Sequence, residues 1–199
     1  ITGGTGYMGK RLIEILLKEG YAVKALVRKG SEKKLPLGCN YDIADALDAT
    51  TFANEIPLNA TFIQLLGVAH PGPMKKKLFR SIDLASAKAS ATAAMQARIQ
   101  YFVYVSVVQS PTMIMQDYQQ CRAEAEAAII ATKLPATFLR PWYVVGPGHY
   151  WPLILQPFFT ILEWIPATQQ KAKALRLLYL NQMLKALLYA VQHPNKAGV

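Results

Sequence analysis

The chain alternates short apolar runs with longer segments in which apolar residues recur every three or four positions. Strands are predicted for the runs at 21–28, 40–43, 61–68, 101–108 and 136–145. Helical spacing occupies 6–20, 75–97, 116–132 and 180–192; in the first of these, Met8, Leu12 and Leu16 share one face. Helices that alternate with apolar strands predict a parallel sheet covered by helices on both faces.

The first helix begins inside a glycine-rich turn, "TGGTGYMG" at 2–9. In such a turn the first glycine permits the tight bend, the second lets a pyrophosphate approach the backbone, and the third lets the helix pack closely. Amides at the helix N-terminus then bind the phosphate charge. Together with the alternating elements, the turn predicts a Rossmann-type doubly wound α/β fold. The expected dinucleotide-binding residues of the turn are Gly3, Thr5, Gly6, Tyr7, Met8 and Gly9.

The end of the run at 21–28 carries a signal for the choice of cofactor. Proteins that select NAD usually place an acidic residue there for the ribose 2′-hydroxyl, whereas this chain has Arg28 and Lys29. A guanidinium can bind a 2′-phosphate through two hydrogen bonds. The sequence therefore favours NADP(H) over NAD(H), and an ordinary solvated basic loop is the alternative.

Composition narrows the possible partners. The net charge is +10, but the basic residues are scattered except at 28–34 and 75–77, without interleaved aromatics, so no nucleic-acid partner is expected. Cys39 and Cys121 are isolated and lack metal-ligand spacing, so no metal site and a cytoplasmic location are expected.

The segment 151–166 is strongly apolar, but its three prolines and one glutamate make it unsuited to span a bilayer. Core packing, a wall of an apolar substrate pocket, and a peripheral contact with a membrane or protein remain open for it.

The 199 residues fit one domain with a small appendage. We expect an NAD(P)-binding domain over 1–145 and a partial C-terminal segment over 146–199 that packs on the substrate side. The chain starts at Ile1, directly on the glycine turn, and ends at Val199 without an obvious stop. Both ends are therefore expected to be truncated.

Six segments in a fixed order carry a resemblance to a known family: 2–9, 42–48, 65–71, 101–107, "YQQCR" at 118–122, and 139–148. The chain resembles the short-chain dehydrogenase/reductase superfamily in its extended or atypical branches. Within these it is similar to NmrA-like proteins and to the nucleotide-binding accessory subunit of respiratory complex I. The resemblance implies further cofactor-binding residues: Asp45 and Ala46 by the adenine, Leu66, Gly67 and Val68 along the ribose, Pro141, Tyr143 and Val144 past the nicotinamide, and Ser106 nearby.

The resemblance breaks at the proton-handling residues. Tyr118 matches the catalytic tyrosine, but Arg122 replaces the lysine four residues later, and Val108 stands where catalytic members carry a hydroxyl, although Ser106 is near. A cation can stabilise a phenolate, but arginine cannot join a proton relay because it stays protonated. Three interpretations remain open: an altered catalytic pair, a pair that clamps the cofactor without catalysis, and a chance spacing on a helix surface.

Two histidines, His70 and His149, follow predicted strands and map to the carboxyl edge of the sheet. Two interpretations remain open for them: replacement of the missing acid–base function, and a structural role alone. The expected function is an oxidoreductase that acts on a small apolar carbonyl or quinone-like compound. A non-catalytic NADP(H)-binding redox sensor or structural subunit is the alternative, and a sugar-nucleotide epimerase or dehydratase ranks third.

Overall fold

A computed structural model describes residues 1–109, 115–150, 153 and 177–194. The strands are β1 (Lys24–Val27), β2 (Asn40–Ile43), β3 (Thr61–Gln64), β4 (Tyr101–Val105), β5 (Ala136–Leu139), β6 (Val144–Val145) and β7 (Leu178–Tyr179). The longer helices are α1 (Tyr7–Lys18), α3 (Ala85–Gln96), α4 (Gln116–Ala131) and α7 (Leu180–Gln192). A short α2 (Lys76–Leu78) and a π-helical turn (Phe79–Leu84) lead directly into α3.

The main sheet is parallel and is joined at its centre by Thr2. The strand β1 pairs with β2, and β3, β4 and β5 pair in that order. Thr2 bridges Leu26 of β1 and Gln64 of β3, so the spatial order is β2, β1, Thr2, β3, β4, β5. This order confirms the predicted doubly wound Rossmann-type arrangement.

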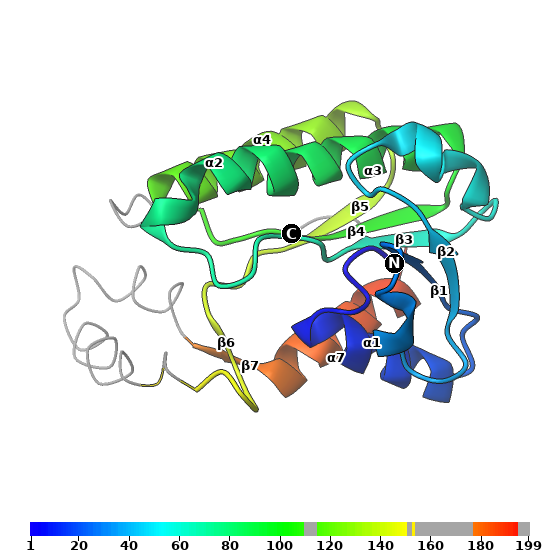
Figure 1. Cartoon of the computed structure of the whole chain (residues 1–199), viewed down its shortest axis with the longest axis horizontal. Helices are drawn as coiled ribbons and strands as arrows, with labels where there is room; N and C mark the ends of the chain where they lie inside the picture. Colours follow the sequence, from blue (N-terminus) through cyan, green and yellow to red (C-terminus); the bar gives the residue numbers. More distant parts are fainter. Residues whose placement is uncertain (110–114, 151–152, 154–176, 195–199) are drawn as a thin grey trace.

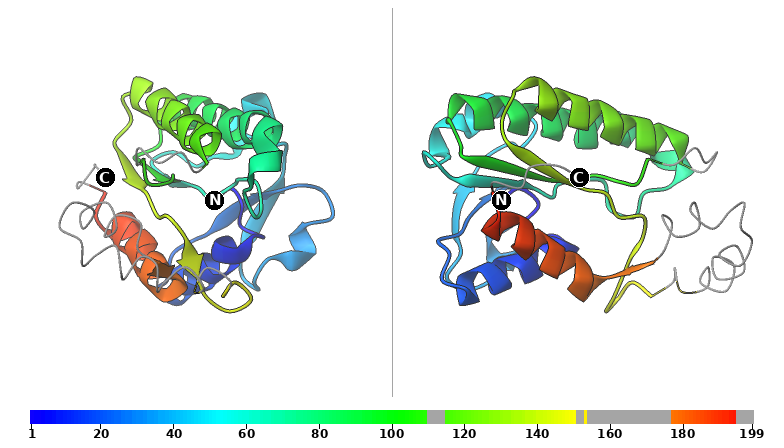
Figure 2. Two further views of the ribbon diagram at one scale, coloured as in Figure 1. Left: turned by 90° about the vertical axis from the view of Figure 1, so that its left-hand side faces the viewer. Right: turned by 180° about the vertical axis from the view of Figure 1, so that it is seen from behind.

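Helices cover both faces of the sheet (Figure 1, Figure 2). The helices α1 and α7 pack together on one face, and α3 and α4 lie on the other. The strand β4 contributes to both cores because its side chains alternate between faces: Phe102 packs with Ala87 and Ile129, while Val103 packs with Leu12. Small residues along α3 let this helix lie close to the sheet.

Four predicted strands are shorter than their apolar runs, and the first of them, β1, begins only at Lys24. The strand β3 ends at Gln64 and β4 ends at Val105, and the run at 136–145 is divided between β5 and β6 around Pro141, which has no N–H to donate. These early strand ends matter because the residues beyond them line the space at the carboxyl edge of the sheet. The apolar segment 151–166 lies, apart from Leu153, outside the described residues.

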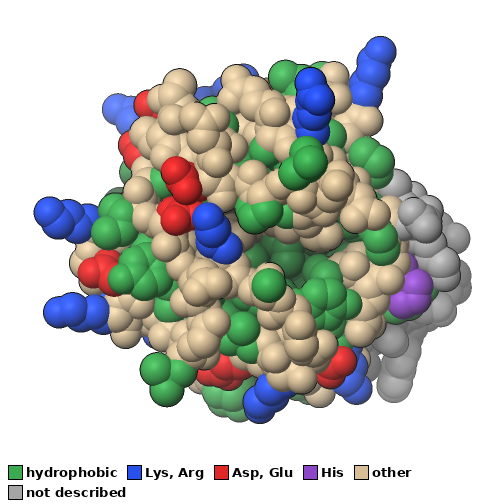
Figure 3. Space-filling model, turned by 90° about the vertical axis from the view of Figure 1, so that its right-hand side faces the viewer, with side chains coloured by type: hydrophobic (Ala, Val, Ile, Leu, Met, Phe, Trp, Pro, Cys, Tyr) green, Lys and Arg blue, Asp and Glu red, His purple; other side chains and the backbone are tan. Residues whose placement is uncertain are grey.

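The opposite, amino-terminal edge of the sheet has a separate hollow of about 460 Å³. Apolar side chains such as Ile1, Val23 and Phe62 line most of it, and Lys24 and Glu55 contribute to its lining (Figure 3). Basic side chains on this face project singly rather than as one patch (Figure 3). In the part of the chain that is described, no helix has the length and apolarity needed to cross a bilayer.

Candidate functional site

A cleft of about 600 Å³ opens at the carboxyl edge of the sheet. Its walls come from the glycine turn, the residues after β3 and β4, the helix α4, and the segment around β6. It brings together most of the residues predicted from the sequence: Gly3, Gly6, Tyr7, Met8, Gly9, Gly67, Val68, His70, Ser106, Tyr118, Arg122, Pro141, Tyr143, Val144 and His149. The sequence did not single out Met115, which also lines it, as does Trp142 within the stretch 141–144.

The glycine turn has the geometry of an anion-binding helix start. Gly3 adopts φ +71°, a left-handed conformation that favours glycine. A Cβ on Gly9 would lie 2.2 Å from the carbonyl oxygen of Gly3, so the helix approaches the turn too closely for any other residue at this position. The helix α1 begins at Tyr7, and no side chain caps it. The amides of its first turn therefore lack intrahelical acceptors and are available to a ligand's phosphate groups.

The residues predicted to bind the adenine end of the dinucleotide and to select NADP(H) are not part of the lining of the cleft. Arg28 and Lys29 follow β1 directly and are exposed. Asp45 is exposed after β2, and its carboxylate accepts from the N–H of Leu47 at 3.0 Å, while Ala46 is buried. Because β1 and β2 are parallel neighbours, these four residues share the carboxyl edge of the sheet. Thr5 and Leu66 are also outside the lining.

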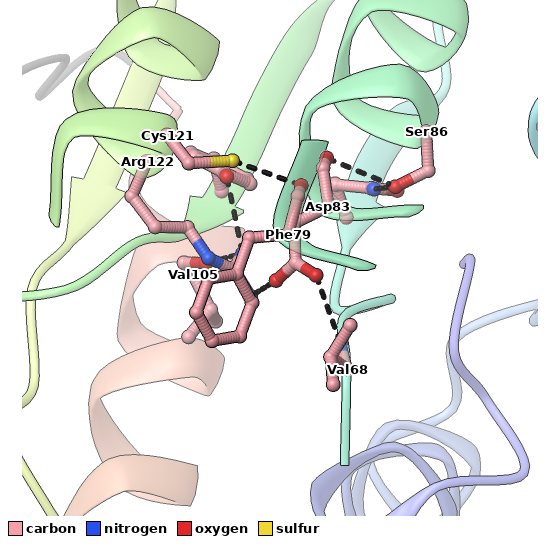
Figure 4. A network of polar contacts seen from close by, with 9 residues as sticks. Val68, Phe79, Asp83, Ser86, Val105, Cys121 and Arg122 are labelled. Carbon is pink, nitrogen blue, oxygen red and sulfur yellow. Dashed lines mark hydrogen bonds and ion pairs between the residues drawn. The ribbon is translucent and has the colours of Figure 1, made fainter. Parts of the chain in front are cut away.

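Arg122 is held by a buried polar network (Figure 4). Its Nη2 donates to Asp83 Oδ1 at 2.5 Å, and its Nη1 donates to Tyr104 Oη at 3.0 Å and to the carbonyl oxygen of Val105 at 3.1 Å. Burial alone would lower the pKa of Arg122, but Tyr118, Tyr104 and Asp83 raise it above its ordinary value, so the guanidinium stays charged. Only 6% of Arg122 is exposed, which argues against a chance spacing on a helix surface.

Tyr118 is half-buried and borders the cleft. The guanidinium carbon of Arg122 lies 5.1 Å from the centre of its ring, and the ring of Phe79 packs at 4.9 Å. Burial raises the pKa of Tyr118, although Arg122 acts in the opposite direction. The net direction differs from what a bare cation beside the phenol would produce, because burial outweighs the cation.

Ser106 and Val108 follow β4 with different environments. Ser106 is 4% exposed and borders the cleft, and among the described residues its Oγ has no hydrogen-bond partner. Val108 brings no hydroxyl, and its N–H donates to the carbonyl oxygen of Pro141 at 3.2 Å. The nearest unsatisfied hydroxyl after β4 is thus that of Ser106, two residues before the family's usual position.

His70 and His149 meet at the mouth of the cleft, with ring centres 5.3 Å apart. His70 adopts φ +49°, and its carbonyl oxygen accepts from Lys75 Nζ at 3.0 Å. Burial, and then the neighbouring His70, lower the pKa of His149 below its ordinary value. The ring of Tyr7 lies 6.1 Å from that of His149, so the two loops and the glycine turn converge here.

The residue that sequence reasoning missed is Asp83. Its carboxylate is fully buried, and it binds both Arg122 and the N–H of Val68 at 3.0 Å. A signal was present: Asp83 is the only acidic residue among the small and apolar residues of "SIDLASAKASATAAM". A lone acid in a helix of that composition is seldom buried without a cationic or N–H partner.

Comparisons with known proteins agree with this geometry. A model of a family described as NAD(P)H-binding matches residues 3–147. A ceramide reductase from Caulobacter vibrioides (strain NA1000 / CB15N) is 25% identical over 155 residues, which is 74% of this chain and 46% of that protein. This chain thus spans less than half the length of that relative.

Solved structures resemble the chain along nearly its whole length. A UDP-galactose 4-epimerase aligns with a TM-score of 0.73 and 16% identity over 99% of this chain and 72% of its own. A short-chain dehydrogenase/reductase superfamily protein from Agrobacterium tumefaciens with bound NAD aligns with a TM-score of 0.71 and 14% identity, over 99% and 74% respectively. At these identities the likeness shows the fold alone.

Proposed function

The chain belongs to the NAD(P)H-binding family, and from that membership we propose that it is a reductase that uses NADPH to reduce a small apolar carbonyl compound. The observation that carries the proposal is the shared cleft. One cleft is lined by the uncapped glycine turn, by the residues after β3, and by Tyr118, a half-buried tyrosine with a cation against its ring.

The residues present fit the dinucleotide. The first-turn amides of α1 would hold the pyrophosphate, and Arg28, at the exposed end of β1, would bind a 2′-phosphate. Gly67 and Val68 would run along the ribose. When bound, the nicotinamide supplies the hydride, and the protein supplies orientation and proton handling.

Tyr118 suits the proton-donating role. A carbonyl that receives a hydride at carbon needs a proton at oxygen, and the phenol of Tyr118 would give it, leaving a phenolate beside Arg122. Burial raises the pKa of Tyr118, so the phenol carries its proton at neutral pH and can donate it. The unpaired hydroxyl of Ser106 would orient the carbonyl oxygen in place of the hydroxyl missing at Val108.

The name of the curated relative, a ceramide reductase, supports reduction as the reaction. An epimerase would first need a base to oxidise its substrate, which a tyrosine with a raised pKa serves poorly.

Non-catalytic NADP(H) binding remains the second candidate. Two residues favour it: Val108, which brings no hydroxyl, and Arg122, which stays protonated and cannot join a proton relay.

The test is NADPH consumption with a panel of aldehydes, long-chain ketones and quinones. Tyr118→Phe should lower turnover by about a hundredfold, the scale of one general acid, while calorimetry shows NADPH binding unchanged. Tyr41→Phe makes the same change at an exposed tyrosine of β2 and should have no effect.

Two outcomes would overturn the assignment. NADPH binding without reduction of any compound on the panel would leave the non-catalytic candidate. Full activity in Tyr118→Phe would exclude this tyrosine as the acid and direct attention to His70 or His149.

A further inference from the structure

Asp83 joins two walls of the cleft through one carboxylate (Figure 4). Oδ1 accepts from Nη2 of Arg122 on α4 at 2.5 Å, and Oδ2 accepts from the N–H of Val68, beyond β3, at 3.0 Å. Asp83 lies in the π-helical turn Phe79–Leu84, a local widening that is frequent at functional sites. The hydroxyl of Ser86 donates to the carbonyl oxygen of Asp83 at 3.2 Å and braces the turn.

Gly67 shows how tightly this junction is built. A Cβ at Gly67 would lie 2.3 Å from Nη2 of Arg122 and 2.9 Å from Oδ1 of Asp83. The backbone after β3 therefore passes in contact with the ion pair, and no side chain could separate them. We call the backbone at Gly67 and Val68 the cofactor-side strip. Because it is in contact with the ion pair, moving the guanidinium of Arg122 would also move this strip.

The charge of the pair acts on Tyr118. Arg122 is buried, and its other acceptors, Tyr104 Oη and the carbonyl of Val105, carry no formal charge. Without Asp83, the full positive charge of the guanidinium would face the ring of Tyr118, whose centre is 5.1 Å away. An unbalanced cation at that distance strongly favours a phenolate.

We propose that Asp83 is a positioning residue of this site: by pairing with Arg122 it offsets the cation beside Tyr118 and keeps the phenol a proton donor, and by binding Val68 it fixes the cofactor-side strip at the same point. The reductive role of Tyr118 in this statement rests on the proposed function. The ion pair itself and its effect on the phenol do not.

The other titratable groups around Tyr118 in the described structure are neutral, so the Arg122–Asp83 pair determines the electrostatic effect on its phenol. Cys121, on the same helix, donates its thiol to the carbonyl of Phe79 at 2.9 Å, and burial raises its pKa, so the thiol stays neutral. On β4, burial raises the pKa of Tyr104 to about 12, so its phenol is neutral as well. The charges that face Tyr118 are therefore those of Arg122 and Asp83.

The experiment follows the Tyr118 phenol by NMR of protein labelled with carbon-13 at the tyrosine ring, with Tyr118→Phe assigning the resonance. In Asp83→Asn the pKa of Tyr118 should fall by about one unit or more, the scale of an opposite charge a few ångströms away. In Arg122→Gln it should rise. Asp83→Glu, which keeps the charge, should stay near the unmodified protein.

Glu126→Gln is the matched control. Glu126 is a second buried carboxylate on α4, and it pairs with Arg140 through two hydrogen bonds of 3.0 and 2.5 Å. Removing its charge also breaks a partly buried ion pair, but the pKa of Tyr118 should not change.

An unchanged or raised Tyr118 pKa in Asp83→Asn, or an equal shift in Glu126→Gln, overturns the proposal. If Asp83→Asn does not fold, the comparison is between Arg122→Gln and the double variant Asp83→Asn/Arg122→Gln. The double variant must then show the lower Tyr118 pKa, and equality overturns the proposal.

The titration uses neither substrate nor cofactor, so absence of turnover defeats the proposed function without touching this result. Where turnover is found, the alkaline limb of the reductase pH profile should move to lower pH in Asp83→Asn, because the acid is then lost earlier.

Discussion

Replacing Arg122 by lysine restores the residue usual in the family, yet the structure predicts a less stable protein. The guanidinium uses two nitrogens for three acceptors: Asp83 Oδ1 at 2.5 Å, Tyr104 Oη at 3.0 Å and the carbonyl of Val105 at 3.1 Å. One ammonium on a flexible stem can keep the ion pair with Asp83, but it cannot reproduce the fork that also reaches β4.

The loss of stability in Arg122→Lys can be estimated from the hydrogen bonds that the variant loses. A hydrogen bond to a charged group contributes about 1.5–3 kcal/mol, and the buried carbonyl left behind adds a desolvation cost, so we expect a loss of about 2–4 kcal/mol. For a domain of this size each kcal/mol corresponds to about 2–4 °C, which gives a fall in Tm of about 5–15 °C.

Thermal unfolding followed by circular dichroism or calorimetry measures this directly. Arg80→Lys is the control, since Arg80 pairs with the carboxylate of Glu124 through two hydrogen bonds, at 2.9 and 3.1 Å, but on the surface. Surface pairs contribute at most about 1 kcal/mol, so its Tm should move little. If the Tm of Arg122→Lys differs from that of the unmodified protein as little as the Tm of Arg80→Lys does, the hydrogen bonds of Arg122 do not stabilise the fold as proposed.

Three further predictions concern the cofactor and the mouth of the cleft. Arg28→Ala should weaken NADPH binding by about 1.5–3 kcal/mol and leave NADH binding almost unchanged in calorimetric titrations; equal losses for both would refute the 2′-phosphate assignment. Gly6→Val should abolish dinucleotide binding in the same titration while circular dichroism shows the fold retained, and unchanged affinity would place the phosphate site elsewhere. Because the pKa of His149 is lowered from 6.5, the unfolded chain binds more protons below that pH, so stability should fall on acidification through about pH 6.5. His149→Gln should flatten this slope in pH-dependent melts, and an unaltered slope would exclude His149 as its source.

The sequence predicted the fold well because its signals are local. The 3.6-residue spacing of α1 and the run of aromatic residues and valines in β4 each lie within one segment, and the glycine turn at 2–9 marks where strand gives way to helix. The ends of the strands were less predictable. Gln64 and Val105 end their strands where the backbone turns to line the cleft, although the sequence remains apolar beyond them.

The polar network was not predictable for a different reason. Asp83 and Arg122 are 39 positions apart and meet because the π-helical turn and α4 lie side by side over the sheet. Periodicity places each residue on an element but does not state which side chains meet across elements. For the same reason the sequence alone could not show that burial would outweigh the cation beside Tyr118.

The measurement that tests the central claim most directly is a crystal structure of the protein with NADPH bound. We expect the pyrophosphate on the first-turn amides of α1, the 2′-phosphate at Arg28, and the nicotinamide ring within reach of the Tyr118 hydroxyl. A dinucleotide bound outside the cleft, or a nicotinamide that Tyr118 cannot reach, would contradict it.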